Sequence, residues 1–214
     1  IDETFDTNVK GTLFTVQKAL PLFNATGSII LTGSSAGTTG APAFTAYSAS
    51  KAAVRNLANT RADDLKGTGI RVNVLSPGAT ATELAKEALG EEGQKAYGAM
   101  TPLQRMADPT EIAAVAAFLA SSDSSFMTAS EVAVDGGLAQ LDNTGAEVRR
   151  SRQGEAALAV SSDLMRTAFQ LGGSILVGIS TGMGQGETTH PVGLHARLVG
   201  FLGGNTGRQM GGWF

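Results

Sequence analysis

The chain is notable first for what it lacks: it has no cysteine, and only 6% of its residues are aromatic. Without cysteine it can form neither disulfides nor thiolate metal sites, which fits a reducing compartment, so we expect a cytoplasmic protein with no metal centre. No apolar run is long enough to span a bilayer, and the first residues do not have the pattern of a signal peptide, so we expect none. The net charge of −3 gives no electrostatic reason to expect a nucleic acid or an anionic membrane as partner.

The composition is otherwise that of a globular protein that can bury a core, with 42% hydrophobic and 16% charged residues among 214. Glycine is unevenly distributed, because 13 of the 28 glycines lie between Gly172 and Gly212. This change of composition predicts three parts: a domain over 1–141, a linker over 142–153 and a glycine-rich tail over 154–214.

The stretch from Ser34 to Lys51 carries the strongest chemical pattern. A buried strand is predicted over 28–31, and Ser34 comes shortly after it. A helix predicted from about 46 to 66 then contains Tyr47 and Lys51. Residues four apart share one face of a helix, so Tyr47 and Lys51 should be neighbours. An ammonium nearby favours the phenolate, so we expect the pKa of Tyr47 to fall from its free value of about 10. Such a phenol can exchange a proton with an alcohol or carbonyl oxygen.

Three further features stand in order around this pair. Residues 2–23 read as an amphipathic helix with Asn8, a poor helix former, in its interior. Ser34 precedes Tyr47 by 13 residues and can share its substrate oxygen, whereas Ser35 is a rival at 12. The strand over 70–75 ends sharply at Pro77 and Gly78, where ligands of open α/β sheets bind. Tyr-x-x-x-Lys alone would suggest only a solvated helix face, and Asn8 alone only an exposed asparagine.

Together these motifs resemble the short-chain dehydrogenase/reductase family over residues of about 5 to 141. The resemblance implies an α/β fold with a Rossmann-like, doubly wound parallel sheet. It implies that Tyr47 is the acid/base and that Lys51 binds the ribose and tunes the phenol. Ser34 would polarise the carbonyl, and Asn8 would hold a relay water.

The resemblance also implies NAD or NADP as cofactor, a small alcohol or carbonyl substrate, and a homo-oligomer, either dimer or tetramer. Besides Tyr47 and Lys51, the cofactor-binding residues would be Pro77, Gly78, Thr80 and Thr82, although Thr82 can also be read as a simple turn threonine. The family's substrate lid would lie over 83–106. A capped helix begins at Asp108, and a last strand over 131–135 ends in Gly136-Gly137. Ala129 departs from the pattern, because the family usually has glycine there.

The family's first strand, its glycine-rich pyrophosphate loop and the residue that chooses NAD or NADP do not precede Ile1. We therefore expect an N-terminally truncated domain. The pattern of the tail predicts a helix near 155–170 and a strand over 174–179, followed by the loop TGMGQGETTH. Thr181, Gly182 and Gly186 fit the start of a dinucleotide loop, so a circular permutation that restores the cofactor site is one alternative.

The tail has a second resemblance. Residues 182–213 resemble a glycine-rich run of molybdopterin-dependent oxidoreductases. His190 and His195 are five apart, which does not place them on one helix face, so surface histidines are the simpler interpretation. Two function hypotheses follow from the whole chain. One is an NAD(P)-dependent oxidoreductase that interconverts an alcohol and a ketone; the other is a catalytically silent fragment or chimera that binds no dinucleotide.

Overall fold

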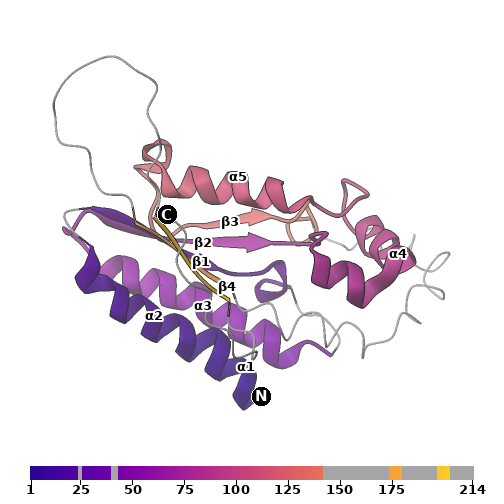
Figure 1. The fold of residues 1–214 in the computed structure, drawn as a ribbon, viewed down its shortest axis with the longest axis horizontal. Helices are drawn as coiled ribbons and strands as arrows, with labels where there is room; N and C mark the ends of the chain where they lie inside the picture. The colour runs from indigo at the N-terminus through magenta and orange to yellow at the C-terminus, as the bar shows by residue number, and fades with distance from the viewer. Residues whose placement is uncertain (24–25, 40–42, 142–173, 180–196, 203–214) are drawn as a thin grey trace.

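The computed structural model describes residues 1–23, 26–39 and 43–141 in full, and 174–179 and 197–202 through their backbone. A five-stranded sheet in the order β3-β2-β1-β4-β5 forms the centre of this part. The strands β1 (Gly27–Thr32), β2 (Ile70–Pro77) and β3 (Glu131–Val134) are parallel. Helices cover both faces of the sheet, α2 and α3 on one side and α5 on the other (Figure 1). The expected doubly wound α/β fold is confirmed.

Alternating side chains of β1 explain this layering. Ile29 and Leu31 point into the core shared with α2 (Thr12–Ala19) and α3 (Thr45–Asp64), whereas Ile30 packs under α5 (Pro109–Ala120). Successive residues of a strand face opposite sides, so a continuous apolar run serves both layers. The predicted strand over 28–31 and helix over 46–66 are therefore both present, with ends shifted by one or two residues.

Capping groups fix where the helices begin. Asp108 accepts a hydrogen bond from the backbone N–H of Thr110 (2.8 Å), and Glu111 accepts one from the N–H of Asp108 (2.8 Å). This is a capping box with Pro109 in the first turn, as the sequence predicts. The helix α4 (Glu83–Ala99) lies beyond the carboxyl ends of the parallel strands and is kinked at Gly90, which has φ 62°. No helix in the described ranges is both long and apolar enough to cross a bilayer.

The first helical segment is not the uniform helix that its periodicity predicts. It consists of α1 (Asp2–Phe5), a π-helical turn (Asp6–Gly11), α2, and a short 3₁₀ turn (Leu20–Leu22). Further 3₁₀ turns occupy Ser35–Gly37 and Ser122–Ser124. A π-turn inserts an extra residue without changing the apolar spacing much, so the period alone does not reveal it.

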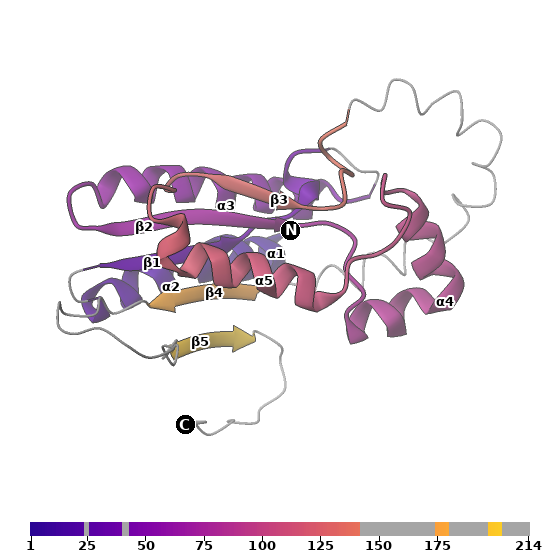
Figure 2. The ribbon, with the colours of Figure 1, turned by 90° about the horizontal axis from the view of Figure 1, so that it is seen from above.

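The two strands from the tail correct the expectation of a purely parallel sheet. β4 (Ser174–Ile179) is the strand that the sequence predicts, but it pairs antiparallel with β1, and β5 (Arg197–Leu202) pairs antiparallel with β4 (Figure 2). Gly178 pairs with Ser28, so β4 ends beside the amino end of β1. β4 therefore runs away from the carboxyl end of β1, the end that Ser34 follows. This direction argues against the circular permutation, which requires a parallel strand.

Several expectations for the tail lie outside the described residues. They are the helix near 155–170, the glycine-rich loop with Thr181, Gly182 and Gly186, and the two histidines, His190 and His195.

Ala129 has a backbone conformation that explains why a glycine would suit its place. Its φ is 54°, in the left-handed region that a Cβ disfavours, and its N–H is held by the carbonyl oxygen of Val72 at 2.7 Å. We predict that Ala129→Gly raises the free energy of unfolding by about 0.5–1 kcal/mol in urea denaturation, since the relief of strain exceeds the added chain entropy.

The matched control for this substitution is Gly67→Ala. Gly67 has φ 81°, and no atom lies within 4 Å of an added Cβ, so only backbone strain is introduced. This variant should lose about 1 kcal/mol. Destabilisation by both substitutions would contradict the strain assigned to Ala129.

Candidate active site

Tyr47 and Lys51 lie in the first two turns of α3, where the helix meets the carboxyl end of β1. The Lys51 side chain is buried, with 3% of the residue exposed, and its Nζ donates a hydrogen bond to the carbonyl oxygen of Thr32 (3.0 Å). Nζ also lies 5.7 Å from the centroid of the Tyr47 ring. Phe44 packs edge-on against the same ring, with centroids 6.2 Å apart. The predicted pairing of Tyr47 with Lys51 on one helix face is therefore present.

Ser34 joins this pair from the strand. It lies two residues after the end of β1, has extended backbone and caps the 3₁₀ turn Ser35–Gly37 by accepting a hydrogen bond from the N–H of Ala36 (3.2 Å). Its side chain is also hydrogen-bonded to that of Tyr47. Ser35, the rival serine, uses its carbonyl oxygen to accept a hydrogen bond from Thr39 (3.2 Å). The structure thus brings Ser34, Tyr47 and Lys51 together at the carboxyl end of β1.

The pKa of Tyr47 does not shift in the direction that the sequence suggests. Burial raises it from 10.0, and the hydrogen bond from Ser34 opposes this without reversing it. Part of the Tyr47 surface remains exposed, but dense surroundings still disfavour the phenolate. Burial also lowers the pKa of Lys51 from 10.5 to about 8. The expectation that the ammonium would lower the phenol's pKa is therefore wrong for the protein without ligands, because removal from water has the larger effect on both groups.

Asn8 is linked to Tyr47 through Ser50, a residue that the sequence interpretation missed. Asn8 is 6% exposed and lies in the π-helical turn, where its Nδ2 donates to Ser50 Oγ (3.0 Å). Ser50 Oγ in turn donates to the carbonyl oxygen of Tyr47 (2.7 Å), and Thr12 Oγ1 donates to the carbonyl oxygen of Asn8 (2.6 Å). The π-turn thus coincides with the predicted asparagine. The one available signal for Ser50 was its position three residues after Tyr47, on the same face of the helix.

The predicted cofactor-binding segment follows β2 at the same edge of the sheet. A Cβ on Gly78 would lie 2.6 Å from Cα of Asp135, the residue after β3, so this close approach is itself a reason for glycine. Thr80 Oγ1 donates to the carbonyl oxygen of Gly78 (3.1 Å). Thr82 caps α4 by accepting a hydrogen bond from the N–H of Ala85 (3.2 Å). Pro77 therefore ends β2 and residues 78–82 follow it at the carboxyl edge of the sheet, where Gly78, Thr80 and Thr82 also have structural roles.

Tyr97, the second of the two tyrosines in the chain, also approaches the site from α4. Burial, the larger cause, and the charge of an ionised Tyr47, which acts only between nearby groups, together raise its pKa to about 12. Tyr97 therefore stays neutral at ordinary pH and can donate a hydrogen bond. The sequence predicted a lid here without identifying a residue in it, because helical periodicity does not say what α4 faces.

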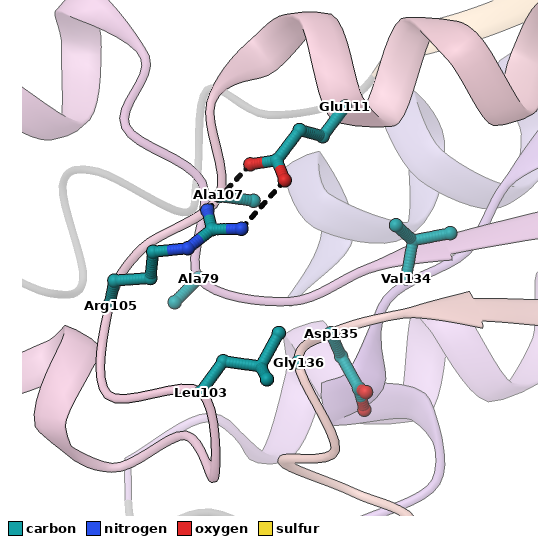
Figure 3. A pocket seen from close by; sticks show the side chains of 8 residues that line it. All are labelled: Ala79, Leu103, Arg105, Ala107, Glu111, Val134, Asp135 and Gly136. Atoms are coloured by element: carbon teal, nitrogen blue, oxygen red, sulfur yellow. Dashed lines mark hydrogen bonds and ion pairs between the residues drawn. The ribbon is translucent and has the colours of Figure 1, made fainter.

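A small cavity of about 70 Å³ lies beside the Pro77–Thr82 segment (Figure 3). Its wall includes Ala79, Leu103 and Val134, and the bidentate ion pair of Arg105 with Glu111 (2.6 and 2.7 Å) closes one side. The Arg105 guanidinium lowers the pKa of Glu111 to about 2. None of the predicted catalytic side chains lines this cavity, so it does not identify a substrate site. Among the described residues, no cluster of three His, Cys, Asp or Glu side chains could hold a metal ion.

Comparisons with known proteins agree with this geometry. A family model described as Enoyl-(Acyl carrier protein) reductase matches residues 1–139. Oxidoreductase asL5 of Sarocladium schorii is 66% identical over 142 residues, which are 65% of this chain and 57% of that protein. The chain thus spans a little over half the length of this curated relative. The family match ends before residues 182–213, so their resemblance to molybdopterin-dependent oxidoreductases has no support there.

Two solved structures share the fold. A short chain dehydrogenase family protein from Francisella tularensis is 31% identical, with a TM-score of 0.58, over 63% of this chain and 60% of that one. The angucycline C-6 ketoreductase LanV with bound NADP is 30% identical, with a TM-score of 0.58, over 62% of this chain and 51% of that one.

The buried Lys51 predicts a pH dependence of stability. Between pH 8 and 10.5 the unfolded chain keeps a proton on Lys51 that the folded protein has lost. The unfolded state then binds more protons, so the contribution of Lys51 to stability rises with pH, by up to about 1.4 kcal/mol per pH unit. Urea unfolding of the wild-type protein and Lys51→Met between pH 7.5 and 9.5 should show this slope only in the former.

The control for this experiment is Lys66→Met at an exposed lysine, which should retain the wild-type slope because Lys51 is intact. Equal slopes in the wild-type protein and Lys51→Met would show that burial does not perturb the Lys51 ammonium.

Proposed function

Because the chain belongs to the short-chain dehydrogenase/reductase family, we propose that it interconverts an alcohol and a ketone with NAD or NADP. One observation carries the proposal: Tyr47 is hydrogen-bonded to Ser34 beside the buried ammonium of Lys51, where β1 ends. A phenol with a second hydroxyl beside it can hold one substrate oxygen between two donors. The proposed substrate is a small molecule with a ketone or secondary alcohol.

The chain's own residues would position the reactants and manage the proton. Tyr47 would pass a proton between its phenolic oxygen and the substrate oxygen, and Ser34 would donate a hydrogen bond to that oxygen. Asn8 and Ser50 would fix the backbone carbonyl of Tyr47 and hence the first turn of α3. A bound nicotinamide would supply the hydride chemistry.

The residues present fit the nicotinamide end of such a cofactor. The Lys51 ammonium has three donors, and the contact with Thr32 uses one of them. The remaining donors suit ribose hydroxyls, and Pro77 to Thr82 would border the ring from β2. The described residues supply this end of a dinucleotide site but no glycine-rich loop for its pyrophosphate.

We further propose that the protein works as a homo-oligomer, which light scattering of the full chain can test.

Dinucleotide binding decides between this function and a catalytically silent chain. We expect NADH or NADPH to bind the full chain, measured by cofactor fluorescence and calorimetry. Tyr47→Phe should lose turnover by about 10²–10⁴-fold, far more than it weakens this binding, since it removes the proton-transfer oxygen but leaves Lys51 and Pro77 to Thr82 in place. Absence of binding by either dinucleotide would support the silent alternative, and wild-type turnover in Tyr47→Phe would refute the role of the phenol.

Tyr97→Phe is the matched variant, because it removes the same atom from the other tyrosine. Tyr97 approaches the site from α4, whereas Tyr47 lies on α3 beside Lys51, so we expect Tyr97 to orient the substrate. Steady-state kinetics should show a severalfold rise in KM with kcat changed less than about threefold, the pattern of lost uniform binding. A loss of kcat as large as that of Tyr47→Phe would instead assign proton transfer to Tyr97.

A further inference from the structure

A group of polar side chains links the separate segments that carry the proposed site. Glu131, the first residue of β3, accepts a hydrogen bond from Ser76 Oγ at 2.6 Å through Oε1. Its other oxygen, Oε2, lies 3.4 Å from Nη1 of Arg55 on α3. The same Nη1 donates to Thr38 Oγ1 at 3.1 Å. From β3, Glu131 is therefore connected to β2, to α3 and, through Arg55, to the loop that follows Ser34.

Each of these connections ends close to a residue of the site. Arg55 is one turn beyond Lys51 and two beyond Tyr47, so the three share a stripe along α3. Ser76 immediately precedes Pro77 and is 1% exposed. It also packs under the residue before Ser34, because a Cβ on Gly33 would lie 2.2 Å from Ser76 Oγ.

We propose that Glu131 is a positioning residue, which holds α3, the loop after Ser34 and the end of β2 in one arrangement through Arg55, Thr38 and Ser76. The inference rests on the proposed function, because the arrangement matters for turnover only if these segments form the active site. Exposed ion pairs usually contribute little to stability, and the Arg55 and Glu131 side chains are 37% and 23% exposed. The contribution expected here is geometric, because displacements of about 1 Å in an active site can reduce turnover by 10²-fold.

Glu131→Gln tests the proposal with a residue of equal size. Its amide can still accept from Ser76, but its NH₂ group or neutral oxygen then faces Arg55, and the charge that holds the guanidinium is lost. We expect kcat to fall about 10- to 100-fold with KM for the cofactor changed less than about threefold. The control is Asp64→Asn, which breaks the exposed pair of Arg61 with Asp64 (3.1 Å) on the same helix and should leave kcat unchanged.

Three variants at the partners Thr38 and Arg55 keep the test decisive if Glu131→Gln folds poorly. Thr38→Val removes only the loop contact and should lower kcat by a smaller factor. Arg55→Lys keeps a cationic donor, so it should retain more activity than Arg55→Met. Wild-type kcat in Thr38→Val and in Arg55→Met would overturn the proposal.

A readout without turnover separates this inference from the proposed function. The chain has two tyrosines, so ¹³C-labelled tyrosine gives two NMR signals, which Tyr97→Phe assigns. Because the hydrogen bond from Ser34 lowers the pKa of Tyr47, loosening the loop in Glu131→Gln should raise that pKa measurably. An unchanged titration would overturn the positioning role even if the protein proved inactive. A shifted titration in a protein that binds no dinucleotide would reject only the proposed function.

Discussion

The site depends on one ammonium that is held away from water at the junction of a strand and a helix. Lys51 is nearly fully buried, and its Nζ is bonded to the carbonyl oxygen of Thr32, where β1 ends. Removing a charge from water is unfavourable, which is why the pKa of Lys51 falls to about 8. The surrounding core must supply this free energy, and the ammonium in turn fixes the distance between α3 and β1.

The same burial explains why a simple electrostatic expectation for Tyr47 was wrong. The sequence places a cation beside a phenol, and a cation alone would favour the phenolate. The fold also removes water from both groups, and that effect raises the pKa of the phenol while the hydrogen bond from Ser34 opposes it. Without ligands the phenol therefore keeps its proton at neutral pH. Sequence spacing could predict which groups meet, but not how much water remains around them.

The elements that the sequence predicts well are those that local signals determine. The apolar run at Ile29–Leu31 and the capping box at Asp108 place β1 and α5 within one or two residues. The features it missed arise from contacts between distant segments. Ser50 matters because Asn8, 42 residues earlier, bonds to it, and Tyr97 because α4 folds over the strand ends. The antiparallel direction of β4 likewise has no local signal, since a strand can pair in either direction.

The helix α3 positions the parts of the site that contact it. The buried residues Val54 and Ala58 pack it against the core and so fix its rotation. Once that rotation is set, the polar stripe on its neighbouring face can contact only particular partners. Lys51 meets β1, Ser50 meets the π-helical turn, and Arg55 meets the start of β3. The apolar spacing of one helix therefore determines where the proposed proton-transfer group lies, because every polar contact in the stripe depends on the same packing.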